Sequence, residues 1–197
     1  MKLYDMQVSG NCYKVRLMLH HLGMAYEKIT VRDMSKGERP RELLAENPSG
    51  RVPLLVLDDG RSLAESNAIL CLLAEGTEYM PGEAFQRAQV LRWMFFEQNH
   101  VEPNIAVVRH WRLVGIDDPD HRAAITLRTT AGHDALGVME RHMQGREFFA
   151  GGYSIADIAL FAYTHVAPEG DFSLDDYPAV RAWIDRVRAR PENIPMT

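Results

Sequence analysis

Short apolar runs and longer helical periods divide the first part of the chain into predicted strands and helices. Apolar or alternating residues at 2–4 and 26–31 are typical of strands. Between them, residues 12–22 carry apolar side chains on one helical face, and Gly23 is expected to stop that helix. A strand, a helix and a strand within about 30 residues predict a βαβ unit whose strands run parallel.

The next segments predict a short helix, a hairpin and a further helix. Residues 33–47 indicate a loop with a short helix, and 54–57 indicate a buried strand. The Asp-Asp-Gly turn at 58–60 leads into an antiparallel partner strand at 62–63. From Glu65 onward, apolar residues return at helical spacing. The resulting order, βαβ–α–ββα, is that of the thioredoxin fold.

The later part of the chain predicts helices alone. Residues 76–83 are rich in turn formers and are expected to link two domains. A long helix over 84–111 should kink at Pro103, because proline lacks the N–H that a helix interior uses. Residues 154–157 match a capping box with Asp in place of the usual Glu. Further helices are expected at 121–144, 158–163 and 178–190.

Composition and charge exclude several classes of protein. The 197 residues are 46% apolar and 25% charged, as is ordinary for a globular chain. The net charge is −5, and residues 1–75 carry ten charges of each sign, so the acidic excess lies later and gives no nucleic-acid footprint. No run reaches the roughly 18 apolar residues that a membrane span needs. Two cysteines make no disulfide framework, and the start lacks a signal-like apolar stretch, so a cytoplasmic location is expected.

Two pairs of residues around the hairpin predict a ligand site. Pro53 begins a strand, so Val52-Pro53 is expected to be cis and to turn the main chain of Val52 toward an extended peptide. Glu65 and Ser66 open the following helix, whose N–H groups attract a carboxylate, while Glu65 can take an ammonium. The alternatives are a trans loop bond and a simple helix cap. Together, the two pairs suit a small peptide with a free α-amino-acid end.

The chain resembles the glutathione transferase family in these motifs. The glutathione-site signature NPxGxVPxL of the family is matched by residues 47–55, and its ESxAI motif by residues 65–69. The capping motif before 158–163 resembles one in a buried helix of that family. The resemblance implies an α/β N-terminal thioredoxin-like domain that binds glutathione over 1–76. It also implies an all-α C-terminal helical domain with a second-substrate pocket over 84–197.

The candidates for the thiol-activating group follow the first strand. The segment resembles serine-type members of the family, in which Ser9 would activate the glutathione thiol and Asn11 could be a second donor. On that match Cys12 faces the core, and Tyr4 and Tyr13 are poorer candidates. Ser9 as a simple N-cap is one alternative. The leading alternative is a glutathione-dependent thiol transferase or peroxidase that uses Cys12, because a helix start lowers a cysteine pKa.

The resemblance also implies how the substrates bind and react. Glutathione would be the co-substrate, and its thiolate would attack a small apolar electrophile in a detoxification reaction. The residues expected to bind glutathione are Arg51, Val52, Pro53, Glu65 and Ser66. Candidates for the second-substrate pocket, on the kinked helix, are Asn99, His100 and Arg109.

Other partners are limited by the motifs that the sequence lacks. HExxH, CxxC, GxGxxG and GKS/T patterns are absent, so we expect no metal, no nucleotide and no cofactor. The resemblance implies a homodimer that uses the helix after Glu65 and the helix from Ala84, with Gln98 or Asn99 near the partner's site. A non-catalytic, glutathione-transferase-like binding protein is a further alternative.

Overall fold

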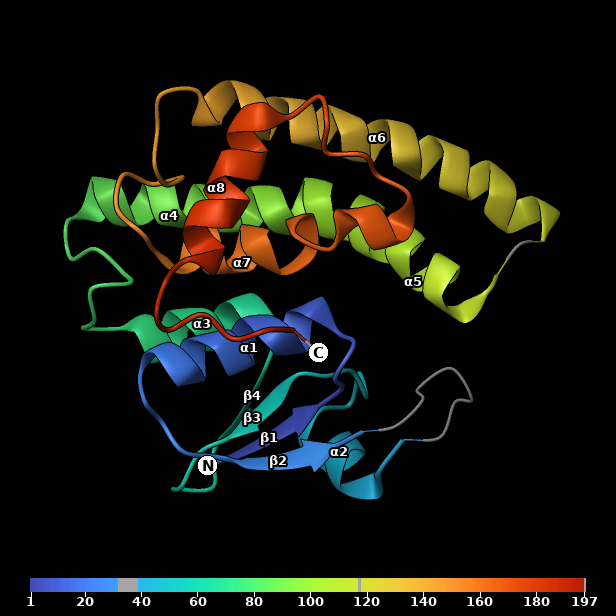
Figure 1. Ribbon diagram of the computed structural model, residues 1–197. Helices are drawn as coiled ribbons and strands as arrows, with labels where there is room; N and C mark the ends of the chain where they lie inside the picture. The colour runs from blue at the N-terminus through green and yellow to red at the C-terminus, as the bar shows by residue number, and fades with distance from the viewer. Residues whose placement is uncertain (32–38, 117, 197) are drawn as a thin grey trace. The chain divides into compact units, whose positions relative to one another are not determined.

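A computed structural model describes residues 1–31, 39–116 and 118–196 (Figure 1). The chain divides into two compact units, of which the first holds residues 1–76 and the segment from Glu192, and the second holds residues 77–191. The sequence pattern predicts that 192–197 belongs to the helical domain. The described part of that segment belongs instead to the first unit, because the Tyr13 hydroxyl donates to the Ile194 carbonyl at 2.6 Å.

The first unit is built on a four-stranded mixed sheet in the order β2-β1-β3-β4. Strand β1 pairs parallel with β2 and antiparallel with β3, which in turn pairs antiparallel with β4. The parallel pair confirms the predicted βαβ unit, and the antiparallel pairs confirm the predicted hairpin. The strands are β1 (Lys2–Asp5), β2 (Glu27–Thr30), β3 (Leu54–Val56) and β4 (Ser62–Ala64).

Helices cover both faces of this sheet. Helix α1 (Gly10–His21) and helix α3 (Ser66–Ala74) lie side by side on one face (Figure 1). Leu43 of helix α2 (Arg41–Glu46) packs with Tyr4 and Leu54, whose side chains point away from those of their strand neighbours. This arrangement is the expected thioredoxin-like fold. The predicted loop before α2 falls partly on residues 32–38, outside the described residues.

Helix α1 begins two residues earlier than the sequence pattern predicts. Ser9 caps it, and its last turn ends at Gly23, which adopts φ 62. The buried face includes Cys12, Val15 and Leu19, all fully inaccessible to solvent. The N-terminus of α1 is therefore anchored in the core directly after strand β1.

The second unit is helical, as predicted. All ten residues of helix α7 (Ile155–Thr164) are buried, and α7 contacts α4, η2 and α8. Gly132 of α6 lies so close to Phe172 that a Cβ there would meet the ring at 2.4 Å, which explains a glycine inside that helix. The other elements are α4 (Ala84–Phe96), η2 (Glu97–Ala106), α5 (Val107–Val114), α6 (Pro119–Met143), η3 (Ala167–Gly170) and α8 (Pro178–Arg188).

The long helix predicted over 84–111 is interrupted by a π-helix rather than by a simple kink. The segment η2 has i→i+5 geometry and contains Pro103. Two side-chain amides support its backbone, because Asn99 donates to the Phe95 carbonyl and Asn104 to the His100 carbonyl, each at 2.8 Å. Among the described residues, no helix has the length and apolar character needed to cross a bilayer.

Candidate functional site

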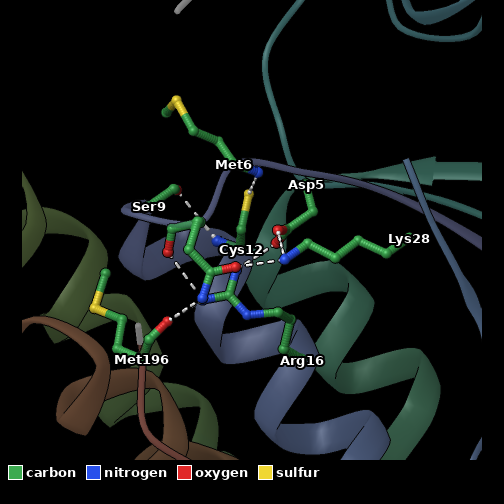
Figure 2. Close-up of polar contacts among 8 residues, drawn as sticks. Asp5, Met6, Ser9, Cys12, Arg16, Lys28 and Met196 are labelled. Carbon is green, nitrogen blue, oxygen red and sulfur yellow. Dashed lines mark hydrogen bonds and ion pairs between the residues drawn. The ribbon is translucent and has the colours of Figure 1, made fainter. Parts of the chain in front are cut away.

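Ser9 lies in the turn between β1 and α1. Its N–H donates to the Met6 carbonyl at 3.0 Å, and its hydroxyl oxygen accepts from the Cys12 N–H at 3.3 Å (Figure 2). The side chain is half-buried. A hydroxyl oxygen that accepts a bond still carries its own hydrogen, which can be donated to another group. Ser9 is therefore an N-cap that retains a donor, so its capping role and its proposed activating role are compatible.

Cys12 is a core residue and a poor nucleophile in this position. Its side chain is fully inaccessible, and the Met6 N–H donates to Sγ at 3.4 Å (Figure 2). Burial raises the pKa of the Cys12 thiol to about 11, more than the hydrogen bonds from Met6 and Ser9 lower it. A reactive cysteine needs an accessible, stabilised thiolate. The geometry thus opposes the alternative in which Cys12 carries thiol transfer.

The two tyrosines near the turn are also engaged elsewhere. Tyr4 is 9% exposed in the packed face of β1, and Tyr13 is 1% exposed with its hydroxyl on the Ile194 carbonyl. Neither hydroxyl is placed as a thiol donor. Ser9 remains the candidate that the turn presents.

Asn11 and Ser66 link the N-terminal ends of α1 and α3. The Ser66 hydroxyl donates to Asn11 Oδ1 at 3.2 Å, and its oxygen accepts from Lys14 Nζ at 3.5 Å. Lys14 also donates to Asn67 Oδ1 at 3.3 Å and is fully buried. An ammonium beneath a helix N-terminus adds positive potential where free N–H groups already favour an anion.

Lys14 is a contributor that the sequence analysis missed. A charged residue among buried apolar neighbours on a helix is rarely buried without a partner. The position of Lys14 among such neighbours was therefore the signal in the sequence that could have identified it. Its partners come from a helix more than fifty residues away along the chain. Their proximity follows from the packing of α1 against α3, which a local motif does not encode.

Glu65 occupies an unusual backbone conformation at the start of α3. It has φ 68 and ψ 110, and its exposed side chain makes no capping bond to the helix. A non-glycine residue at positive φ costs free energy and is concentrated at functional sites. The strained position leaves the carboxylate at the rim of the α3 N-terminus, beside Ser66.

The Val52-Pro53 bond is cis, as the sequence predicts. The preceding turn is held by Asn47, which donates through Nδ2 to the Arg51 carbonyl at 2.9 Å and accepts from the Ser49 N–H at 3.2 Å. Arg51 is exposed, Val52 is half-buried and Pro53 is buried. Arg51 therefore presents its guanidinium to solvent, while Pro53 belongs to the core.

The three candidates for a second-substrate pocket do not form one group. Asn99 and His100 line a hollow of about 270 Å³ within the helical unit. Arg109 is 5% exposed and its guanidinium binds Glu169 at 2.7 and 2.8 Å, so it meets a carboxylate of the protein itself. The imidazole of His100 stacks on the Phe96 ring at 4.8 Å. The remaining lining residues of the hollow are Arg92, Trp93, Phe95, Phe96 and Val138.

Comparison with known families gives two matches that cover most of the chain. The family described as glutathione S-transferase, N-terminal domain, matches residues 3–78. The family described as glutathione S-transferase, C-terminal domain, matches residues 119–191.

Individual relatives match nearly the whole chain. A crystal structure of a glutathione S-transferase from Pseudomonas fluorescens is 46% identical, covers 99% of this chain and 98% of its own, and superposes with a TM-score of 0.95. The disulfide-bond oxidoreductase YfcG of Escherichia coli (strain K12) is 30% identical over 92% of this chain and 87% of its own length. A glutathione transferase from Burkholderia graminis, solved with two glutathione molecules bound per subunit, is 27% identical with a TM-score of 0.84, over 97% of this chain and 84% of its own.

Proposed function

We propose that this chain, which belongs to the glutathione S-transferase family and is a glutathione transferase, conjugates the glutathione thiolate to small apolar electrophiles. Ser9 is the proposed donor to the thiolate. The observation that carries the proposal is the turn itself, in which a half-buried hydroxyl caps α1 and keeps its hydrogen for another acceptor.

The free-energy requirement for such a mechanism is modest. A thiol of pKa about 8.5 is only about 3% ionised at pH 7, and lowering that pKa by two units needs about 2.7 kcal/mol of preference for the anion. One hydrogen bond to a charged group supplies about 1.5–3 kcal/mol, and a helix N-terminus adds about 0.3–1 kcal/mol. Ser9 and the N-terminus of α1 therefore suffice together without a general base.

The proposed glutathione site uses the two other features of the first unit. The γ-glutamyl carboxylate would lie at the N-terminus of α3, where the main-chain N–H of Ser66 and the buried Lys14 ammonium favour an anion, and Glu65 would take the ammonium group. The main chain of Val52 would pair with the cysteinyl unit, and the exposed Arg51 is a candidate for the glycyl carboxylate. The glutathione complex of the Burkholderia graminis relative supports glutathione as the co-substrate.

Calorimetry on Glu65→Ala tests this binding site. The variant should bind glutathione at least about tenfold more weakly, the effect of losing roughly 1.4 kcal/mol from a charged hydrogen bond. Glu75→Ala, a substitution at the other end of the same helix, is the matched control and should bind normally. Unchanged affinity in Glu65→Ala would refute the assignment.

The hollow beside Asn99 and His100 is the proposed electrophile pocket. Its wall of Trp93, Phe95 and Phe96 suits an aromatic or aliphatic substrate, and Asn99 and His100 supply polar groups at its edge. Arg109 is not retained, because its guanidinium is already paired with Glu169. Val138→Trp, which would fill the hollow, should raise the KM for the electrophile and leave the KM for glutathione unchanged.

A second candidate function is glutathione-dependent disulfide reduction, which the YfcG relative favours. In that reaction the glutathione thiolate held by Ser9 would attack one sulfur of a disulfide, forming a mixed disulfide and releasing the other sulfur as a thiolate, so Cys12 is again not required. A panel of 1-chloro-2,4-dinitrobenzene, a peroxide and a disulfide, each with glutathione, separates the two reactions. Conjugation as the fastest reaction supports the first candidate, and faster turnover of the disulfide replaces it with the second.

A homodimer is part of the proposal, by analogy with the family. Phe85 and Phe95 of α4 are 64% and 65% exposed, and Leu72 of α3 is 45% exposed, so each helix offers apolar surface. Light scattering should give twice the chain mass of 22.4 kDa, and Phe85→Glu should shift it toward the monomer. A monomer at micromolar concentration would contradict this part.

The proposed cytoplasmic location is testable by cell fractionation.

A further inference from the structure

The guanidinium of Arg16 ties three separate segments of the first unit together. It is 4% exposed, and its Nη1 binds Asp5, which is fully buried at the end of β1 (Figure 2). Its Nη2 donates to the main-chain carbonyls of Gln7 at 3.0 Å and Met196 at 2.8 Å. One planar group thus connects the sheet, the turn before α1 and the C-terminal segment.

The side chain of Gln7, in the turn before α1, also bonds the C-terminal segment. Its Nε2 donates to the Met196 carbonyl at 2.9 Å, so that carbonyl accepts from both Gln7 and Arg16. Lys28 binds Gln7 Oε1 and lies 3.1 Å from Asp5 Oδ2. Residues 194–196, which we call the C-terminal strap, are therefore bonded directly to the residue two positions before Ser9.

We infer that the C-terminal strap positions the Ser9 turn for thiolate stabilisation, an inference that rests on the proposed function of Ser9. The turn is short: the Ser9 N–H returns to the Met6 carbonyl, and between them the strap accepts a bond from the Gln7 side chain while Arg16 donates to the Gln7 main-chain carbonyl. A donor that must be held within about 0.5 Å of its productive position beside a thiolate needs such support from its surroundings. Gln7 and Arg16 are positioning residues, because they act through Ser9.

The chain provides a matched control for this inference. Tyr13 also holds the strap, through the bond from its hydroxyl to the Ile194 carbonyl, but it makes that bond from inside α1. Tyr13→Phe removes a strap contact of similar kind without touching Gln7. It should lower stability slightly and leave the chemistry of Ser9 unchanged.

The test compares Gln7→Ala and a chain lacking residues 195–197 with Tyr13→Phe. The readouts are kcat, the KM for glutathione, and the pKa of the enzyme-bound glutathione thiol from its ultraviolet thiolate absorbance between pH 5 and 9. The charged and ionisable groups around the turn, Asp5, Cys12, Arg16 and Lys28, are retained in all three variants. Hydrogen exchange of residues 6–12 gives a measurement that does not depend on activity.

We expect Gln7→Ala and the shortened chain each to raise the bound-thiol pKa by at least about half a unit and to lower kcat about threefold or more at pH 6.5, with the KM for glutathione within about twofold. Exchange of residues 6–12 should accelerate in both. Combining the two changes should add little, because both remove the same bond. Tyr13→Phe should match the parent in pKa and kcat.

The other outcomes separate this inference from the proposed function. If Ser9→Ala raises the bound-thiol pKa and neither strap variant does, the strap inference is overturned and the function of Ser9 stands. If Ser9→Ala leaves that pKa unchanged, the proposed function of Ser9 fails and the strap inference fails with it. Faster exchange accompanied by an unchanged pH profile would reduce the strap to a purely structural contact and also overturn the inference.

Discussion

One serine caps a helix in each of the two units, and the different surroundings of these two serines give them different roles. Ser9 caps α1 in the first unit and Ser154 caps α7 in the second, each by accepting a main-chain N–H at 3.3 Å. Ser154 is 2% exposed, and Asp157 completes its capping box. Ser9 is half-buried, and no residue of α1's first turn is acidic.

The difference lies in how many polar groups each cap satisfies internally. Asp157 accepts from the N–H of Phe149, the N–H and hydroxyl of Ser154, and Nε1 of Trp183. These bonds saturate the cap and join α7 to α8 and to the loop before it. The hydroxyl of Ser9 accepts one bond and keeps its hydrogen. A capping serine is thus structural when neighbouring groups use all its hydrogen-bonding capacity, and it can bind a ligand when they do not.

The largest expected effect is on the saturated cap. Asp157→Ala leaves several buried donors without an acceptor, each costing about 1–3 kcal/mol, so the free energy of unfolding should fall by at least about 3 kcal/mol. Urea unfolding measures the loss. Asp59→Ala, on an exposed turn, is the control and should change stability little. A loss below about 1 kcal/mol in Asp157→Ala would remove the contrast between the two caps.

The same carboxyl should give stability a pH dependence of defined sign. Burial raises the pKa of Asp157 to about 6, against about 3.9 in the unfolded chain. Between these pKa values the native state holds a proton that the unfolded state has lost. The contribution of Asp157 to the free energy of unfolding therefore falls as pH rises from about 4 to about 6, by up to roughly 3 kcal/mol. Burial lowers the pKa of His165 to about 4, which has the opposite sign. The measurement is therefore the difference in slope between the parent and Asp157→Asn, and equal slopes would contradict the prediction.

The open cap should show its effect in chemistry as well as in stability. Ser9→Ala should raise the bound-thiol pKa by about one unit or more and slow conjugation about tenfold near neutral pH, equivalent to about 1.4 kcal/mol, with glutathione affinity nearly unchanged. Each substitution removes a cap and should lower stability by about 0.5–2 kcal/mol, but Ser154→Ala should leave the pH–rate profile intact. Both variants can be measured by the same titration and the same urea series. Similar pH–rate profiles for the two would erase the distinction.

The smallest expected effect is at Cys12. Cys12→Ala should leave the conjugation rate within about twofold, because the buried thiol is protonated at neutral pH and lies away from solvent. Its cost should be confined to stability, through lost packing and the lost bond from the Met6 N–H to Sγ. An inactive Cys12→Ala beside a normal Ser9→Ala would reverse the assignment of the thiol-activating residue.

The fold and part of the local geometry of the candidate site could be predicted from sequence, because their signals are local. Alternating and helical periods define the strands and helices, and the capping box at 154–157 and the cis Val52-Pro53 bond both follow from short motifs. The boundaries of α1 and the π-helical character of η2 differed from the pattern. In both, side-chain bonds to the main chain, from Ser9, Asn99 and Asn104, accompany the observed backbone geometry, and apolar periodicity does not record them.

The sequence by itself determined the order of the elements along the chain, the thioredoxin-like and helical parts, and the motifs at 47–55 and 65–69, since each is recorded in local patterns. Only the tertiary structure decided what surrounds them. It buried Cys12, paired Arg109 with Glu169, and brought Lys14 to Ser66 and the C-terminal strap to Gln7. These contacts join residues far apart in sequence, and whether a polar side chain is saturated or available depends on packing that no local pattern specifies.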